Sequence, residues 1–371
     1  MSNRAAVTAI CLLFGANLFA QTPAPSGAPT AKNPAAKSPT ATPSPSPSPA
    51  PSNQEIINSL GDADLQAALS LLKSNFANPE SITETELNRA TLTGLLARMP
   101  GGFVLLPNRE NASPEPGAPV FSEIFENHVG YLRVGSLNGA NLKELDKNLQ
   151  DFAAKKVNAA IVDLRASASG DFATAAEFAK RFCPKGKALF SLRKQGARQD
   201  RSFSSDRDPV FQGLLVVLVD DETAGGAEAL AAALRLYNKA LLIGHTTAGR
   251  AVEYSDSPLP SGKTLRVASA EAVLADGQPL FPSGVKPDLP VEMSMAAKHE
   301  IFRVSGEKGM SMFVYETERP HLNEAALIAG TNPELEIPER PNRGREKSQP
   351  HDSVLQRALD VVTSLEIYQK R

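Results

Sequence analysis

The stretch that decides the fold runs from Leu214 to Arg250 and reads LLVVLVDDETAGGAEALAAALRLYNKALLIGHTTAGR. Its two apolar runs, Leu214–Val219 and Ala240–Ile243, are typical of strands that are buried on both faces. A turn of small residues and an alanine-rich segment lie between them, and this pattern predicts a tight turn followed by a helix that ends near Leu236. The stretch is therefore predicted to be strand, turn, helix, strand and glycine loop, an arrangement in which α/β proteins place functional residues at strand ends.

The turn and the loop of this stretch resemble those of the tail-specific, or C-terminal processing, serine peptidases. The turn TAGGAE (Thr223–Glu228) stands where the family has Ser-Ala-Ser-Ala-Ser-Glu, and GHTTAGR (Gly244–Arg250) stands where it has Gly-Glu-x-Thr-x-Gly-Lys. The nucleophilic serine of the family falls at Gly225, and its general-base lysine falls at Arg250. A supporting glutamine of many members falls at Tyr254. The resemblance implies the family's frame without its serine–lysine pair.

The side chains at these two positions exclude the family's reaction. Gly225 offers no nucleophile, and the guanidinium of Arg250 stays protonated near neutral pH, so it cannot accept a proton. A serine–lysine mechanism needs a hydroxyl and a neutral amine within hydrogen-bond reach. We therefore predict that the catalytic pair is not intact and that the chain is a pseudopeptidase, although the sequence leaves open whether it is an enzyme.

A second loop of the family carries backbone donors for the oxyanion in the pattern Asp-Leu-Arg-Asn-Asn-x-Gly-Gly. The matching segment here, Asp163–Gly170, reads DLRASASG. Gly170 keeps the second glycine of the pattern, and Ser169 replaces the first. Because only glycine adopts positive φ freely, the geometry of an oxyanion donor at Ser169 is predicted to differ from that of the family.

Two other residues of the same segments offer an alternative hypothesis. Thr223 in the turn and His245 in the glycine loop provide a hydroxyl and an imidazole, the groups of a nucleophile and its base. Glu228 and Glu253 are candidates to orient the imidazole. The opposing interpretation is that Thr223 binds backbone groups of its turn while His245 is an exposed loop residue. An active peptidase that uses Thr223 is therefore the alternative to an inactive homologue.

The segments around this stretch predict an α/β fold, and the resemblance implies a crotonase-like tail-specific protease core with N- and C-terminal helical extensions. We place the core at residues 120–295. Within it we expect the following elements: strands at Gly130–Val134, Ala159–Arg165 and Leu265–Ala268, an edge strand at Leu189–Leu192, and helices at Leu142–Lys155 and Ala173–Phe182.

Residues 54–100 are predicted to be an N-terminal helical segment. Leu65, Leu69 and Leu72 recur at helical spacing and predict one apolar face. Thr83 is the expected N-cap of a second helix, with Glu86 as its capping-box partner. Met99–Pro119 is expected to be a loop, too short for the peptide-binding PDZ domain that many members of the resembled family carry.

The last segment, residues 296–371, is a predicted extension that ends in a helix. A charged, proline-rich loop is expected at Asn332–Pro350. The spacing of apolar residues from Val354 to Leu365 then predicts an amphipathic helix that docks on the core, with Asp352 or Ser353 as its cap.

The first 20 residues have the features of an export signal: Arg4, an apolar run at Ala5–Phe14, and a cleavage site after Ala20. Residues 21–53 hold proline, serine and alanine without a large apolar residue, so a disordered linker is predicted. No later apolar run is long enough for a transmembrane helix. We therefore expect a periplasmic or secreted protein without a transmembrane segment in its mature form.

The composition narrows the class of partner. The net charge of −2 gives no reason to expect nucleic acid. The five histidines are scattered, so no metal site is predicted, and no phosphate-binding glycine loop or other cofactor motif occurs. Cys183 is the only cysteine beyond the predicted signal and is expected to be a buried apolar residue. The expected partner is a polypeptide or protein, and the oligomeric state is left open.

Overall fold

A computed structural model describes residues 53–107, 117–126, 128–238, 240–314 and 350–369. The chain divides into two compact units, Met1–Ala77 and Asn78–Arg371. The predicted signal peptide, all but the last residue of the predicted linker, and almost all of the loop predicted at 332–350 lie outside the described residues. Within the described part of the chain, no helix is both long and apolar enough to cross a membrane.

The described part of the first unit consists of α1 (Asn53–Ser59) and α2 (Asp62–Asn75). The predicted helical structure is confirmed here. The leucines expected to form a packed face on α2 are instead exposed, and no residue of α2 is buried. The boundary after Ala77 separates α2 from α3 (Glu84–Arg98), which we had expected in the same helical segment.

The N-cap of α3 is the predicted residue. The side chain of Thr83 accepts a hydrogen bond from the backbone N–H of Glu86 at 3.2 Å, which satisfies one of the free donors at the start of the helix. The carboxylate of Glu86 pairs with Arg89 on the same exposed helix. No residue of α3 is buried, so the apolar face expected on this helix is not packed either.

The second unit is built on a six-stranded sheet in the order β13-β10-β8-β4-β3-β2. All pairs are parallel except that of β2 with β3. The strands are β2 (Phe121–Phe125), β3 (Val129–Arg133), β4 (Ala159–Asp163), β8 (Leu214–Val219), β10 (Leu241–Gly244) and β13 (Leu289–Pro290). The parallel strands predicted from apolar runs are thus confirmed, while β2 was not predicted.

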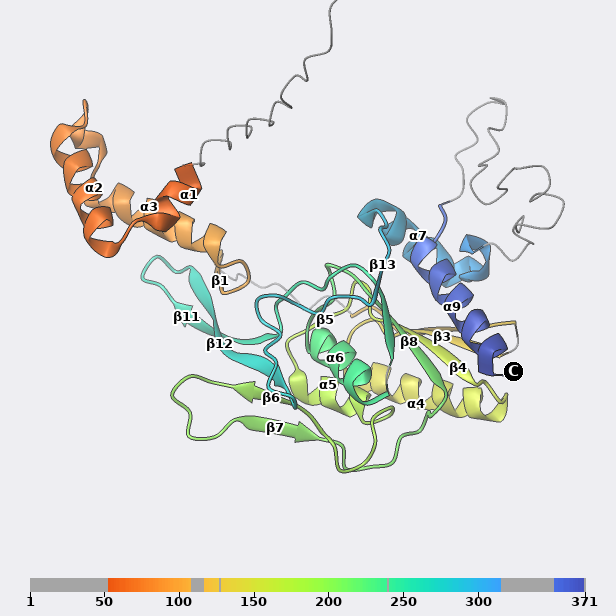
Figure 1. Cartoon of the computed structure of the whole chain (residues 1–371). Helices are drawn as coiled ribbons and strands as arrows, with labels where there is room; N and C mark the ends of the chain where they lie inside the picture. The colour runs from red at the N-terminus through yellow and green to blue at the C-terminus, as the bar shows by residue number, and fades with distance from the viewer. Residues whose placement is uncertain (1–52, 108–116, 127, 239, 315–349, 370–371) are drawn as a thin grey trace, which may run out of the picture. The chain divides into compact units, whose positions relative to one another are not determined.

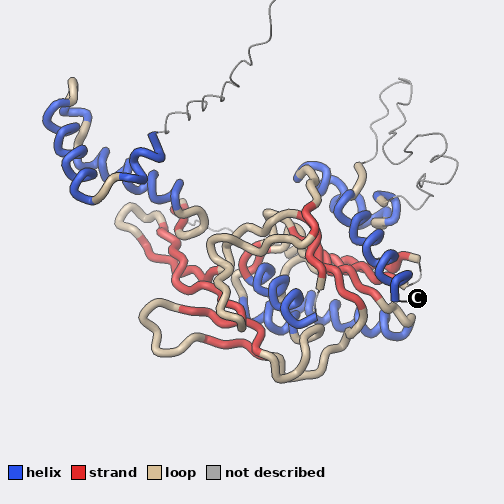
Figure 2. The backbone as a smooth tube through the Cα atoms, in the orientation of Figure 1, coloured by secondary structure: helices blue, strands red, loops and turns tan. Residues whose placement is uncertain are grey.

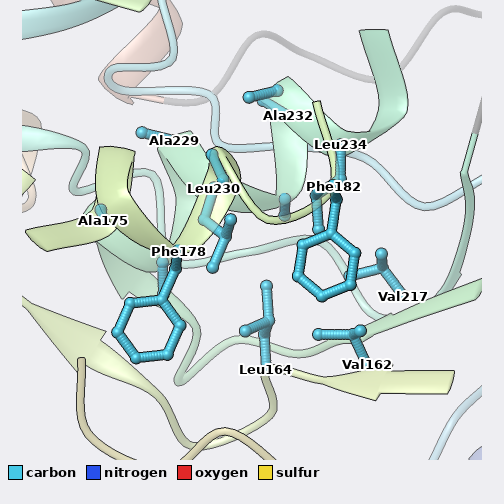
Figure 3. Packing of buried hydrophobic residues seen from close by; sticks show 14 of the residues in the cluster. Val162, Leu164, Ala175, Phe178, Phe182, Val217, Ala229, Leu230, Ala232 and Leu234 are labelled. Carbon is cyan, nitrogen blue, oxygen red and sulfur yellow. The ribbon is translucent and has the colours of Figure 1, made fainter. Parts of the chain in front are cut away.

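Three helices pack against one face of this sheet, namely α4 (Gly139–Ala154), α5 (Phe172–Ala179) and α6 (Gly226–Asn238), as Figures 1 and 2 show. In Figure 3, Val162 and Val217 of the sheet point toward Phe182 and toward Leu230 and Leu234 of α6. These side chains are all almost fully buried. Burying apolar surface of this kind contributes about 25 cal/mol per Å² to folding, which explains why α6 is so rich in alanine and leucine.

The opposite face of the sheet is covered by α7 (Met295–Lys308) and α9 (Ser353–Gln369), with the short 3-10 helix η2 (Ser311–Phe313) between them in the chain. The predicted C-terminal helix is therefore confirmed, and it docks as expected through Leu355 and Val362. Of the two candidate caps, Asp352 is the one that acts, because its carboxylate accepts the N–H of Leu355 at 2.9 Å. The sequence did not predict α7.

A second sheet has the order β1-β12-β6-β7, with β11 also paired to β12. Its strands are β1 (Phe103–Leu106), β6 (Ala188–Arg193), β7 (Arg201–Ser204), β11 (Val252–Pro258) and β12 (Thr264–Leu274). Two expectations are wrong here. The segment Met99–Pro119 was predicted to be a loop, but β1 lies within it, because its apolar run pairs antiparallel with β12. The strand at Leu189–Leu192 was predicted at an edge, but β6 lies between β12 and β7.

A buried ion-pair network joins the end of β4 to the start of α9. The guanidinium of Arg165, 1% exposed, bonds both oxygens of Asp163 and both oxygens of Asp352, at 2.6–3.1 Å. The hydroxyl of Tyr131 donates to Asp163 at 2.7 Å. One cation is thus shared by two carboxylates that stand almost 190 positions apart in the sequence, which couples the central sheet to the C-terminal helix.

This network predicts a loss of stability in acid. Burial alone would raise the pKa of Asp352, but the charge and hydrogen bonds of Arg165 lower it below its usual value of 3.8. The unfolded chain therefore binds the proton more tightly, so Asp352 stabilises the fold above its unfolded pKa, and this contribution is lost as the pH falls through its folded pKa. We expect urea unfolding at pH 6 and at pH 3 to show this loss, and an Asp352→Asn variant to lose less stability between the two conditions.

Candidate functional site

The predicted site lies where β8 ends. The chain leaves Val219, turns at Asp220, and forms the two-residue strand β9 (Ala224–Gly225) before α6 begins. The carboxylate of Asp220 accepts the N–H groups of Glu222 and Thr223 at 3.1 and 3.0 Å, which shapes the turn. These bonds fix the backbone that carries Gly225.

Glu228, in the first turn of α6, connects this turn to the glycine loop. One carboxylate oxygen accepts the N–H groups of Gly225 and Arg250, at 3.0 and 2.8 Å. The other oxygen accepts the Thr247 hydroxyl at 2.5 Å and the N–H of Gly249 at 2.7 Å. The two positions at which the resemblance places the nucleophile and the base are therefore held side by side by one fully buried carboxylate.

The electrostatics of Glu228 reflect two opposing effects. Burial raises the pKa of its carboxyl group, while the hydrogen bonds from the Thr247 hydroxyl and from three backbone N–H groups oppose that rise. The sequence did not reveal this role, since we considered Glu228 only as a partner for His245. A signal was nevertheless present: an acidic residue in the first turn of a helix otherwise composed mainly of alanine and leucine.

We expect Glu228→Gln to lower the free energy of unfolding by about 2 kcal/mol, because the amide N–H₂ would face buried N–H donors and leave them without an acceptor. Urea unfolding monitored by circular dichroism measures the change. The matched control is Glu144→Gln on α4, whose side chain is 55% exposed, and it should shift stability by less than about 0.5 kcal/mol. Equal effects for the two variants would contradict the connecting role of Glu228.

The backbone around Gly225 leaves no room for a side chain. Its φ is +64°, and a Cβ built on it would lie 2.1 Å from the carbonyl oxygen of Ser169. The cause is a short parallel ladder between β5 (Ala168–Ser169) and β9, supported by a bond of 2.9 Å from the N–H of Ala224 to the oxygen of Ser167. In this arrangement, the loop that would supply the oxyanion donors packs directly against the position of the nucleophile.

Arg250 and Tyr254 both contact the segment that leads into β1. The backbone at Arg250 is fixed by Glu228, and its side chain is exposed. A Cβ built on Gly101 would lie 2.8 Å from Cγ of Arg250, so only glycine fits at that position without a shift of the arginine. The hydroxyl of Tyr254 donates to the carbonyl oxygen of Gly101 at 2.8 Å. Burial raises the pKa of Tyr254, and the nearby cation of Arg250 opposes the rise.

Of the two residues in the loop at which the resemblance places the oxyanion donors, only Ser169 has a side-chain contact. The hydroxyl of Ser169 accepts the N–H of Asp171 at 3.1 Å. Asp171 in turn caps α5 by accepting the N–H groups of Ala173 and Thr174. Gly170 does not adopt positive φ, and a Cβ built on it would meet no atom within 4 Å.

Thr223 and His245 have different partners in the described part of the chain. The Thr223 hydroxyl is fully buried, bonds the carbonyl oxygen of Leu164 at 2.9 Å, and accepts the N–H of Asp220 at 3.0 Å. The His245 side chain is 52% exposed, and its Nε2 lies 3.9 Å from Glu292. Glu253, a candidate to orient the imidazole, pairs with Arg201 instead. The structure therefore supports the interpretation in which Thr223 satisfies its turn and His245 is a loop residue.

A cavity of about 110 Å³ lies at the ends of β8 and β10, and its lining includes Arg165, Asp220, His245 and Lys298. Neither Gly225 nor Arg250 lines it. Lys298 is almost fully buried and pairs with Asp220 and, at 2.6 Å, with Glu222. Among the residues that the structure describes, no group of three or more histidine, cysteine or acidic side chains could hold a metal ion.

Comparison with known proteins identifies the segment that contains this geometry. Residues 128–291 match the family model described as Peptidase family S41. This segment belongs to peptidase family S41. The family assignment expected from the turn and the loop is therefore confirmed, and the S41 segment accounts for most of the core predicted at 120–295.

Curated relatives of the S41 segment agree with this assignment. The chain is 30% identical over 184 residues to the carboxy-terminal processing protease CtpA of Bacillus subtilis, which covers 49% of this chain and 39% of the relative. It is 27% identical over 173 residues to the carboxyl-terminal-processing protease of Synechocystis sp., covering 47% of this chain and 40% of that protein. The chain therefore matches only about two fifths of the length of these relatives.

Among solved structures, a candidate peptidase from Parabacteroides merdae is similar, with a TM-score of 0.50 and 15% sequence identity. The similarity covers 65% of this chain and 85% of that chain. At that identity the likeness concerns the fold alone. The predicted α/β class is confirmed as a mixed α/β fold of the S41 type.

Proposed function

We propose that this chain is an S41 homologue without peptidase activity, which binds a polypeptide or acts as a scaffold through a crotonase-like core. The observation that carries the proposal is the backbone of Gly225, which has a φ of +64° and lies against the carbonyl oxygen of Ser169. No hydroxyl is available there, and the space that it would occupy is filled by backbone. The partner position, Arg250, holds a permanent cation in place of a proton acceptor.

The surroundings of Arg250 support recognition of a carboxylate. Its side chain is exposed, and within the described part of the chain no carboxylate pairs with its guanidinium. Strand β11 begins two residues later and, among the described strands, pairs with β12 alone, so its other edge is available to a further strand. A peptide added antiparallel to β11 would run toward Val252 and bring its C-terminal carboxylate near Arg250.

Peptide binding tests this function directly. We expect Arg250→Ala to weaken binding of peptides with a free C-terminus by about tenfold, because a charge-assisted hydrogen bond to the carboxylate is lost. Peptides with an amidated C-terminus should bind the two proteins equally. Fluorescence anisotropy measures both series, and mass spectrometry of the same mixtures reports whether any peptide is cleaved.

Arg198→Ala is the control for loss of one exposed positive charge, and it should leave both series unchanged. Equal affinities for free and amidated peptides in the unsubstituted protein would refute carboxylate recognition. Cleaved peptide would refute the absence of activity, and labelling of one hydroxyl by a fluorophosphonate probe would identify the nucleophile.

The location of the protein is a further part of this proposal. Residues 1–20 have the composition of an export signal, and residues 21–53 that of a linker, so we propose a periplasmic or secreted protein whose linker separates the folded segment from the cell envelope. Removal of residues 2–20 should leave the protein in the cytoplasm, as cell fractionation would report.

A further inference from the structure

Two methionine side chains line the cavity at the ends of β8 and β10 together with His245. They are Met293 and Met295, in the segment that leads from β13 into α7 (Figure 1). Val291, Met293 and Met295 are half-buried while the residues between them are exposed, which is the alternation of an extended segment. The N–H of Val291 donates to the carbonyl oxygen of Gly244 at 2.9 Å. The cavity therefore brings together one imidazole and two thioethers from segments far apart in the sequence.

The imidazole of His245 presents the lone pair of its Nε2. Its Nδ1 lies 3.2 Å from the carbonyl oxygen of Thr246, and because a carbonyl only accepts, Nδ1 carries the proton of that hydrogen bond. Nε2 lies 3.9 Å from Glu292, too far for a hydrogen bond, and it has no other polar partner among the described residues. A backbone carbonyl that binds one ring nitrogen is a common partner of a histidine that holds a metal through the other.

Each thioether sulfur lies at the wall of the cavity. Sδ of Met293 is 3.6 Å from Nη1 of Arg165, and Sδ of Met295 is 3.5 Å from Nζ of Lys298. Both cations line the cavity themselves, so the sulfur atoms that contact them face the same space. These contacts are weak, because a thioether is a weak acceptor. They leave each sulfur with a lone pair for a further ligand.

The charge around the cavity favours a cation. Arg165 and Lys298 are each paired with two carboxylates, and two further, exposed carboxylates also line the cavity. The six are Asp163, Asp220, Asp221, Glu222, Glu292 and Asp352. Negative charge therefore exceeds the positive charge of the two cations, and a bound cation is attracted by this excess.

We propose that His245, Met293 and Met295 bind copper(I). Thioether sulfur is a soft ligand that selects copper(I), imidazole nitrogen also suits copper, and the hard divalent cations prefer oxygen. The inference is independent of the proposed peptide binding, because neither Gly225 nor Arg250 lines the cavity. It revises the expectation that the chain has no metal site, which rested on the scattered histidines and did not consider methionine.

Competition with bicinchoninate, a chelator that forms a coloured copper(I) complex, tests the proposal on the full chain under reducing, oxygen-free conditions. We expect the chain to take up about one copper(I) ion. Met293→Leu and Met295→Leu should each weaken binding by at least about tenfold, because one of three ligands is lost while the side-chain volume is kept. Circular dichroism of each variant confirms that the fold is retained.

Met99→Leu is the matched control, because Met99 is 50% exposed and does not line the cavity. This variant should bind copper(I) as the unsubstituted chain does. The chain also has two cysteines, so a variant with both Cys11→Ala and Cys183→Ala should retain the ion. A chain that binds no copper(I), an affinity that neither Met293→Leu nor Met295→Leu changes, or binding that is lost with the two thiols would overturn the proposal.

Methyl NMR identifies the sulfur atoms that bind. Silver(I) is the probe, since it is a soft monovalent cation, and the methionine methyl groups carry carbon-13. The signals that move on addition of silver(I) should be the two that disappear in Met293→Leu and Met295→Leu. His245→Ala should raise the silver(I) concentration that is needed by at least about tenfold. A shift confined to the other methionines of the chain would refute the site.

Discussion

Replacing Arg165 with methionine is expected to lower the free energy of unfolding by about 3–5 kcal/mol, the largest effect that this structure predicts for one residue. The guanidinium of Arg165 is the shared partner of Asp163 and Asp352, and all three side chains are buried. Methionine would fill much of the same volume, but it would leave two carboxylates in the interior without a cation. That cost exceeds the loss of a hydrogen bond, because a buried charge without a partner loses its hydration and gains nothing in return.

Urea unfolding measures this change, and limited proteolysis near Arg357 reports whether α9 leaves the sheet. The control is Arg193→Met, in which the side chain is 48% exposed and pairs with Glu271. This substitution should change stability by less than about 1 kcal/mol. Adding Asp163→Asn and Asp352→Asn to Arg165→Met should recover part of the loss, since the unpaired charges disappear. Failure to recover any stability would show that the loss came from packing.

Restoring the family's serine at Gly225 is expected to damage the protein and to leave it inactive. A serine at a φ of +64°, with its Cβ 2.1 Å from the oxygen of Ser169, must push β5 away from β9. We expect a loss of about 3 kcal/mol, from the strained backbone conformation together with the displaced strand. Adding Arg250→Lys supplies an amine, but it does not move the loop, so hydrolysis should still be absent.

Unfolding and a peptide-cleavage assay with the double variant measure these outcomes. Gly170→Ser is the matched control, because it places the same side chain one residue beyond β5, where a Cβ meets no atom within 4 Å. Its stability should lie within about 0.5 kcal/mol of the unsubstituted protein. A double variant that cleaves peptides at unchanged stability would mean that the backbone at Gly225 adapts freely and that only two side chains separate this chain from an active peptidase.

The parts of the fold that were predictable are those in which neighbouring residues alone decide the structure. The apolar run Leu214–Val219 specifies a buried strand by itself, and so does the run before Asp163. By contrast, α7 was missed because it buries Lys298 and Ser305. Those polar residues are stable inside only because Asp220, Glu222 and Arg133 contact them from distant parts of the chain. Periodicity of apolar residues cannot reveal a buried lysine whose partner is 78 positions away.

The candidate site, like the fold, could be predicted from the sequence only in part. The resemblance of the turn and the loop to those of the family was enough to predict that Gly225 and Arg250 lie together. It did not indicate that Glu228 binds both backbones, because a carboxylate that accepts backbone N–H groups leaves no pattern of side-chain types. Nor did it indicate that β5 closes over Gly225, since that contact depends on the conformation of two short strands. The types of side chain at the site could therefore be predicted from the sequence, whereas the backbone contacts between its loops could not.

The pairing of Arg165 with Asp352 also has a consequence for biosynthesis. Arg165 emerges from the ribosome long before α9 and before Asp352, the second of the two carboxylates that bind it. A nascent chain that stops before residue 350 holds a complete central sheet with one face uncovered, and with one of the two carboxylates that bind Arg165 missing. Folding of this segment must therefore wait until α9 has been translated, and chains truncated before residue 350 should be degraded rather than accumulate.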